Sequence, residues 1–335
     1  MSLPQDIYSV IDNKCTQTLI RDLLRQYRET LGNLVRIGTT KPEMLDNLRN
    51  AVDQHQIPKH VIEQMIRDCE ENGNQRIFLF NATKNKSTYS DAEAVASELF
   101  REDDLTSFPR YALKRNEFVW GDFRPEGRSW TGKIYGHQER LKEAKQEEKN
   151  GFVVKYYERR EDRIVCVAEW SSPVLQMRIS RDGLDSQSAL NRRIGILWEM
   201  LSNVVEKGDF KVWDLTSVIR KMLQKAENNK DVYSLSDVRF QDSGLGAAEF
   251  NTHGTGEALS TVPERAKAID SYLAGGGRVR EVTVHWNPEA ANGVFGDDPL
   301  RVIVGGKDPN CINIPAATTR RGVQYVINSL RKIAR

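Results

Sequence analysis

Hydrophobic and polar residues alternate most regularly in the middle of the chain. Residues 152–157 and 163–170 are rich in aromatic and β-branched side chains, and the residues between them are all charged. Such side chains favour β-strands, so the pattern predicts a hairpin that turns at 158–162. Residues 173–180 alternate apolar residues with polar Gln176 and Arg178, as in a strand with one face toward solvent. Together these stretches predict a three-stranded meander.

The first part of the chain instead has the three- and four-residue spacing of amphipathic helices. Apolar residues at 15–31 fall on one helical face. A second helix is predicted to begin after Thr40, a suitable N-cap, with Glu43 as its partner in a capping box. A third helix is predicted at 61–69. The apolar run 77–80 that follows suits either a strand or a fourth, buried helix.

Helices and strands follow one another irregularly in the C-terminal half. Helices are predicted at 186–207, 213–227, 262–273 and 319–334, and strands at 232–241, 278–286 and 300–304. Glycine-rich residues 242–256 are predicted to form a loop. The absence of a regular strand–helix–strand repeat favours an α+β arrangement.

The predicted fold class is therefore α+β, with an N-terminal helical bundle followed by a mixed, mainly antiparallel sheet domain with helices. A chain of 335 residues is longer than one hydrophobic core usually supports. The expected divisions are a helical domain at 1–82, a linker at 83–106, a β-meander region at 107–185 and an α+β domain at 186–335. Within the meander region, residues 139–149 carry mixed charges and are predicted to form a solvated helix.

Composition limits the class of protein more than its function. Hydrophobic residues make up 39% of the chain, which is enough for packed cores, and 49 basic and 47 acidic residues leave a net charge of +2. An anionic partner would therefore have to bind local clusters of cations. The four cysteines lie far apart, and no stretch is long and apolar enough to span a membrane. An intracellular location, cytoplasmic or nuclear, without a membrane partner is expected.

Sequence motifs for catalysis or metal binding are lacking. The five histidines and four cysteines do not have zinc-ligand spacing, and Gly305–Lys307 does not have the spacing of a phosphate-binding loop. Asp162 and Glu169 flank a predicted strand as the acids of a metal-dependent nuclease would, but no lysine completes that motif. No cofactor is expected.

Basic side chains gather at several places that suit a nucleic-acid backbone. Three arginines follow one another at about one helical turn in the helix at 15–31, although they are also typical of the solvated side of such a helix. Two more begin the last helix, where positive charge opposes the helix dipole. Aromatic residues interleaved with arginines at 108–130 suit stacking on single-stranded nucleic acid, although such residues more often belong to a core. The candidate nucleic-acid-binding residues are Arg21, Arg25, Arg28, Arg36, Lys41, Arg159, Arg160, Arg320, Arg321 and Lys332.

The order of these features resembles the centromere protein N family. Residues 57–84, where a short helix leads into Arg76–Phe80, residues 157–170, and the strand and terminal helix at 300–334 carry the likeness. Members of that family have a pyrin-like helical domain and a mixed α/β domain, form a basic groove for DNA and recognise centromeric nucleosomes. The resemblance implies a pyrin-like fold for the helical domain and DNA as a partner. The Ala- and Gly-rich run 254–277 departs from the family pattern.

Three hypotheses follow. The first is a non-enzymatic DNA-binding adaptor, similar to kinetochore proteins, that grips the duplex backbone with cations from both domains and joins protein partners in a larger complex. The second is a nuclease or other nucleic-acid-processing component of a defence or repair complex that uses Asp162 and Glu169. The third is a protein-interaction subunit that does not bind DNA. The first hypothesis requires the distant cations to converge into a single positive concavity and not to be paired with carboxylates.

Overall fold

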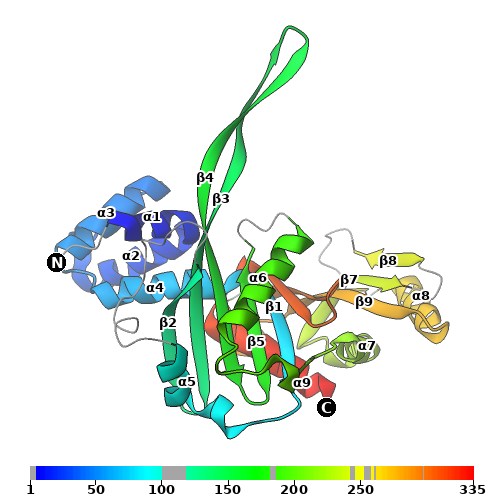
Figure 1. Ribbon diagram of the computed structural model, residues 1–335. Helices are drawn as coiled ribbons and strands as arrows, with labels where there is room; N and C mark the ends of the chain where they lie inside the picture. The colour runs from blue at the N-terminus through cyan, green and yellow to red at the C-terminus, as the bar shows by residue number, and fades with distance from the viewer. Residues whose placement is uncertain are drawn as a thin grey trace. The chain divides into compact units, whose positions relative to one another are not determined.

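A computed structural model describes residues 5–99, 118–181, 186–241, 246–252, 258–259, 262–296 and 298–335 (Figure 1). The chain divides into two compact units. The described residues up to Asn72 form a helical unit, and the described residues from Gly73 onward form a sheet unit. The predicted α+β class is confirmed.

The helical unit has one hydrophobic core between its helices. Its described elements are α1 (Gln5–Lys14), α2 (Gln17–Leu31), the short turn η1 (Gly32–Leu34), α3 (Lys41–Asp53) and α4 (Lys59–Glu71). The core contains Ile11, Ile20, Leu24, Met44 and Ile66. The three predicted helices correspond to α2, α3 and α4, and their predicted apolar faces are confirmed. Thr40 caps α3 as predicted, and the Glu43 carboxylate accepts a hydrogen bond from the Thr39 backbone at 2.8 Å. Helix α1 was not predicted.

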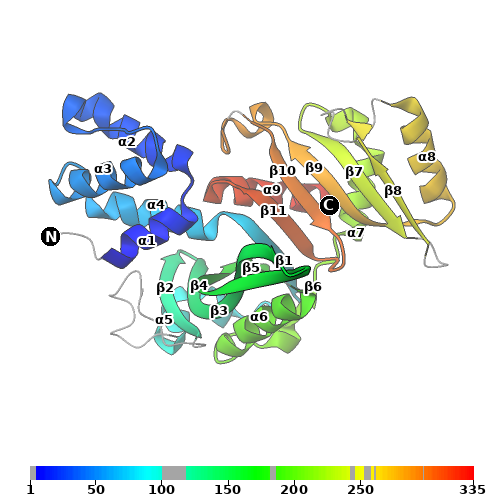
Figure 2. The same ribbon diagram turned by 90° about the horizontal axis from the view of Figure 1, so that it is seen from above.

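A single antiparallel sheet organises the sheet unit. Its described strands follow the order β2–β3–β4–β5–β1–β11–β10–β9–β7–β8, and β6 also pairs with β1 (Figure 2). The strands are β1 (Gly73–Ala82), β2 (Phe118–Glu126), β3 (Ser129–Lys149), β4 (Phe152–Ser171), β5 (Val174–Ser180), β6 (Phe210–Val212), β7 (Tyr233–Gln241), β8 (Ala247–Asn251), β9 (Arg278–Trp286), β10 (Leu300–Gly305) and β11 (Cys311–Ala317).

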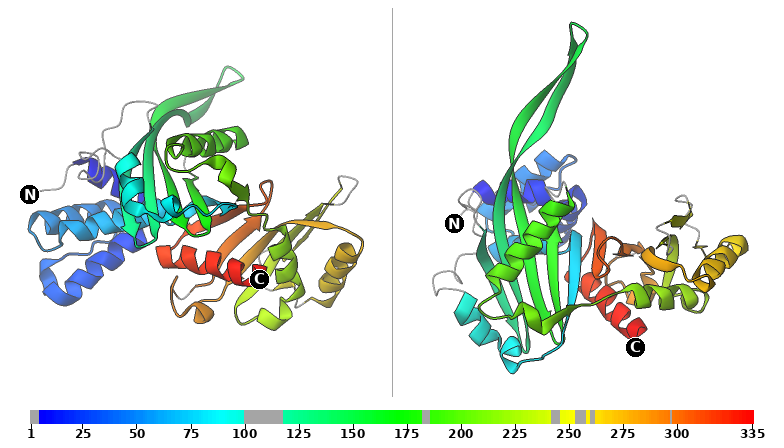
Figure 3. Two further views of the ribbon diagram at one scale, coloured as in Figure 1. Left: turned by 60° about the horizontal axis from the view of Figure 1, so that its bottom comes forward. Right: turned by 45° about the vertical axis from the view of Figure 1, so that its right-hand side comes forward.

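Helices cover the two halves of this sheet on opposite faces (Figure 3). Helices α5 and α6 share a first core with β2–β5, and α7 and α9 share a second core with β7 and β9–β11. Strand β1 belongs to both cores, because Phe78 and Phe80 enter the first whereas Ile77 and Leu79 enter the second. The helices of the sheet unit are α5 (Ala92–Leu99), α6 (Gln187–Met200), α7 (Thr216–Gln224), α8 (Pro263–Ala274) and α9 (Arg320–Ala334).

The predicted meander has its turn in the wrong place. Strand β4 continues without a break through 158–162, and the turn lies at Asn150–Gly151 instead. The φ values of Asn150 and Gly151 are 53° and 76°, the positive values that a two-residue type I′ turn requires. Residues 139–149, predicted as a helix, belong to β3 because each has a cross-strand partner or lies at the bulge near Ala144. The outer parts of β3 and β4, residues 139–162, form a two-stranded ribbon (Figure 1).

Other predictions also need correction. The helical domain was expected to extend to residue 82, but this range includes β1, which is part of the sheet unit. The expected linker contains η2 (Ser87–Ser90) and, at the place where one weak helix was expected, α5; the linker assignment is wrong because Val95 of α5 is buried in the first core. The expected solvent face of β5 is wrong, since Gln176 and Arg178 are buried. Strand β8 lies in the predicted glycine-rich loop, and β6 and β11 were not predicted. Among the described helices, none has the length and apolarity needed to cross a membrane.

The two cysteines of the helical unit generate a first testable prediction. Cys15 Sγ, between α1 and α2, lies 2.7 Å from Cys69 Sγ on α4, not far beyond the disulfide bond length of about 2.05 Å. Oxidation by diamide, which accepts two electrons and two protons, is expected to close this disulfide and to stabilise the helical unit by about 2–4 kcal/mol. Intact-mass analysis and chemical unfolding measure the two effects.

The variant Cys69→Ser is the control and should show neither the mass loss nor the gain in stability. Cys166 and Cys311 in the sheet unit are buried and should stay reduced. A disulfide that includes either of them, or no disulfide at all, would contradict the prediction.

Candidate functional site

The predicted cations of the helical unit are mostly exposed. Arg25 and Arg28 on α2 and Arg36 after η1 face solvent, and Arg21 is partly exposed. Arg25 pairs with Asp22 at 3.9 Å, but both side chains are more than half exposed, so this pair opens at little cost. The residues of α2 that are fully buried are Ile20 and Leu24. We call Arg21, Arg25, Arg28 and Arg36 the α2 surface.

Lys41 has a structural role instead. Its ammonium group donates a hydrogen bond to the Asp12 carbonyl oxygen and lies 3.4 Å from the Asp12 carboxylate. It therefore fastens the start of α3 to α1, and it is only partly exposed. Lys41 is less suited to bind an anionic partner than the α2 surface.

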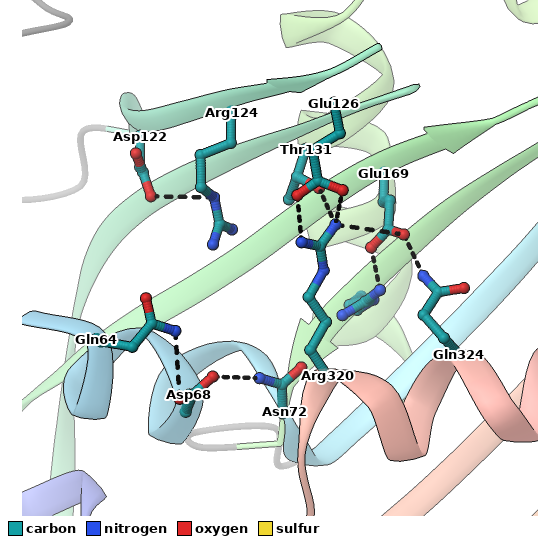
Figure 4. Close-up of polar contacts among 11 residues, drawn as sticks. Gln64, Asp68, Asn72, Asp122, Arg124, Glu126, Thr131, Glu169, Arg320 and Gln324 are labelled. Carbon is teal, nitrogen blue, oxygen red and sulfur yellow. Dashed lines mark hydrogen bonds and ion pairs between the residues drawn. The ribbon is translucent and has the colours of Figure 1, made fainter. Parts of the chain in front are cut away.

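Arg320, which begins α9, is held by carboxylates of the sheet (Figure 4). Its guanidinium donates two hydrogen bonds to Glu126 at the end of β2, one of them at 2.8 Å, and a third to Thr131 at 3.3 Å. Glu169 lies 4.0 Å away. These hydrogen bonds from Arg320 lower the pKa of Glu126, which stays ionised. Because Glu126 neutralises Arg320, this residue is less suited to bind an anionic partner than the α2 surface.

Glu169 on β4 also belongs to the interior. Its carboxylate accepts hydrogen bonds from the Arg178 guanidinium on β5 and from the Gln324 amide on α9 (Figure 4). Arg178 is 1% exposed and also donates to the side-chain amide oxygen of Gln176 at 3.2 Å. Glu169 thus serves as the counter-ion of a buried arginine, which leaves it poorly placed to hold a catalytic metal.

The nuclease hypothesis also named Asp162, whose side chain lies outside the described part of the structure, as does the side chain of Arg160. Across the described residues, no three His, Cys, Asp or Glu side chains come together in a way that could hold a metal ion. Arg321 and Lys332 are exposed on α9, one in its first turn and the other in its last. Arg331 donates a hydrogen bond to the Ser171 carbonyl oxygen at 3.0 Å, and burial lowers its pKa.

Arg159 is exposed on the ribbon, where several other charged side chains are paired with one another. Lys155 lies 2.9 Å from Glu143, and Lys145 and Lys149 each lie 2.6 Å from Glu147. Hydrogen bonds from these two lysines, and then from Tyr156, lower the pKa of Glu147 to about 2. The two ion pairs of Glu147 should therefore persist well into the acidic range.

The ribbon also exposes large apolar side chains, which the sequence reading did not identify as a site. Phe152 at the turn is 74% exposed, and Tyr157 is 54% exposed. The others are Leu141, Val153 and Tyr156. The Asn150-Gly151 dipeptide was the signal that could have revealed this ribbon, because it is the strongest short-range indication of a hairpin.

Aromatic residues 118–130 do not form a stacking surface. Trp120, Phe123 and Trp130 are buried in the first core, and the Trp130 indole donates a hydrogen bond to the Tyr89 carbonyl oxygen at 2.8 Å. The part of that stretch before residue 118 lies outside the described residues.

No protein-family model matches the sequence, and no curated protein is significantly similar to it.

The buried ion pair gives a second testable prediction. Glu169→Gln removes the counter-ion of Arg178 and should destabilise the sheet unit by about 3–5 kcal/mol, because an unpaired buried charge is costly. Urea unfolding followed by tryptophan fluorescence measures the change. The control Glu143→Gln breaks an exposed ribbon pair and should change stability by at most about 1 kcal/mol. Equal effects of both substitutions would contradict the assignment.

Proposed function

We propose that the protein is a non-enzymatic adaptor that binds the backbone of duplex DNA through the α2 surface. The exposure of Arg25, Arg28 and Arg36 supports this proposal most directly. Side chains one turn apart on α2 are separated by about 5.4 Å along the helix axis, so neighbouring guanidinium groups can contact successive phosphates. A guanidinium group also forms paired hydrogen bonds with phosphate oxygens.

The contact surface is smaller than the sequence alone indicated. Arg320 is neutralised by Glu126, and Lys41 contacts Asp12, so neither is available. Binding through the few cations of the α2 surface should be weak, independent of base sequence and dependent on salt. Such an interaction suits an adaptor that gains further affinity from a second partner.

This proposal gives a third testable prediction. The triple variant Arg25→Ala, Arg28→Ala, Arg36→Ala should lose most of its affinity for a random duplex. Its plot of log affinity against log salt should be flatter by about three units, because each lost phosphate contact removes about 0.9 of slope. Fluorescence anisotropy between about 50 and 200 mM salt measures both quantities.

The control changes three exposed cations of the sheet unit, Lys211, Arg220 and Lys225, to alanine. It alters the net charge equally and should leave the affinity and the slope nearly unchanged. Equal losses in the two triple variants would show that only net charge matters, and the α2 surface would then not be the site. No binding by the unchanged protein would overturn the proposal.

A second function, binding of a protein partner, is supported by the ribbon. Exposed aromatic side chains are typical of protein interfaces, and the paired charges of the ribbon leave little attraction for phosphates. The exposed apolar residues of the ribbon suit a groove on another protein that takes up both faces of the hairpin. The adaptor would then use its helical unit for DNA and the ribbon for the protein.

The fourth testable prediction concerns this ribbon. Phe152→Ser combined with Tyr157→Ser should weaken the affinity for a purified partner by about 10–100-fold, as expected when interface aromatic residues are lost. Candidate partners come from cross-linking at position 152, and each is then purified and titrated by calorimetry. The α2 triple variant should bind the same partner normally. If no purified candidate binds, or if the double variant binds as well as the unchanged protein, the ribbon is not the interaction site.

A further inference from the structure

A polar hollow of about 570 Å³ lies on the sheet unit, on the face of β1, β11, β10, β9 and β7 opposite to the second core. The alternation of β1 places Arg76 on this face, because its neighbour Ile77 enters the second core. The strand register then aligns Arg76 with Asn313, Asn313 with Ile303, and Ile303 with Thr283. We call this site the sheet hollow. It is independent of the α2 surface and of the ribbon.

The carboxylates of the sheet hollow already have partners. Arg239 lies 3.0 Å from Glu281 and 3.2 Å from Glu249. Asp237 accepts a hydrogen bond from the Ser236 hydroxyl at 2.9 Å. These groups lie on β7, β8 and β9, at one end of the hollow.

Asp308, beside Lys307, is the fourth carboxylate, and it accepts a hydrogen bond from the Gln187 amide at 2.9 Å. Each acid of the hollow is therefore engaged within the protein.

Three cations of the sheet hollow contrast with these acids. They are Arg76 on β1, Arg301 on β10 and Lys307 after β10. Their side chains have no hydrogen bond or ion pair with any other residue that the structure describes. Arg76 lies beside Asn313 of β11, whereas Arg301 is near the start of β10 and Lys307 follows its end. Gly305 sets the position of Lys307, since its φ is 85° and an added Cβ would lie 2.2 Å from the Arg280 carbonyl oxygen.

We propose that the sheet hollow binds a small phosphorylated molecule, with the phosphate between Arg76, Arg301 and Lys307. Unpaired guanidinium groups bind phosphate oxygens with paired, charge-assisted hydrogen bonds, and Lys307 adds a third positive charge. The Asn313 amide can donate another hydrogen bond. The Thr283 hydroxyl and the Asp237 carboxylate accept hydrogen bonds from hydroxyl or amino groups of the same ligand.

The size and position of the hollow agree with such a ligand. Its volume falls within the range of about 300–1,000 Å³ that is usual for small-molecule sites. Five adjacent strands contribute to its floor, so the binding groups are held on a rigid sheet. The phosphate is expected toward β1, where Arg76 lies beside Asn313.

Titration calorimetry with pyrophosphate, ribose 5-phosphate, AMP and unphosphorylated adenosine tests this proposal. At least one phosphorylated compound should bind, and adenosine should bind much more weakly or not at all. Arg76→Gln and Arg301→Gln should each weaken binding by about 10-fold or more, since each removes charge-assisted hydrogen bonds. If Arg76→Gln does not fold, Lys307→Gln replaces it, because Lys307 lies in an exposed turn.

The control Arg220→Gln removes an exposed cation of α7 and should leave the affinity unchanged. The α2 triple variant should also bind the ligand normally, so failure of DNA binding and failure of this site are separate results. The proposal is overturned if none of the phosphorylated compounds binds. It is also overturned if binding does not depend on Arg76 and Arg301, or if adenosine binds as tightly as AMP.

Discussion

The sheet unit depends on the burial of β1 from both sides. Strands β5 and β11 pair with its two edges, and its alternate side chains enter two different cores. The backbone at Leu79 shows how completely this strand is enclosed, because it bonds with both the backbone and the side-chain amide of Asn310. Two half-sheets covered by helices on opposite faces remain one sheet because a single strand belongs to both. Each half-sheet also has a second face, opposite to its own core. The buried ion pair lies on one of these faces and the sheet hollow on the other.

The two polar faces of this sheet differ in how their charged side chains are paired. Beside α9, Glu169 and Arg178 neutralise each other in the interior, and Arg320 adds a second contact with Glu126. On the face of the sheet hollow, the acids are paired while three cations remain without a partner among the described residues. Charge count alone does not distinguish these situations, because both faces contain arginines and carboxylates. Only the second face has cationic side chains that are available to bind a ligand.

Features with local causes were predictable from the sequence. The helix at 15–31, the Thr40 cap and the strand at 278–286 follow from spacing and capping within a few residues, and all are present. The charged segment 158–162 resembles a turn in the sequence, because its strand conformation depends on pairing with β3. The local sequence signal for the hairpin turn is Asn150-Gly151. The ion pair of Arg320 was not predictable, since its partner Glu126 lies 194 residues earlier in the chain. The exposed arginines of α2 were predictable because amphipathic spacing alone decides which face of a helix is wet.

The position of β1 also determines when the molecule can be completed. Asn310, which closes the edge of β1 at Leu79, lies 231 residues further along the chain. While the polypeptide is being synthesised, the helical unit can fold as soon as it leaves the ribosome, but β1 must wait for almost the entire chain. During that interval one of its edges has no partner, and an apolar strand with an open edge readily associates with other chains. The strand order therefore leaves β1 open to pairing with other chains until the last strands of the sheet have been synthesised.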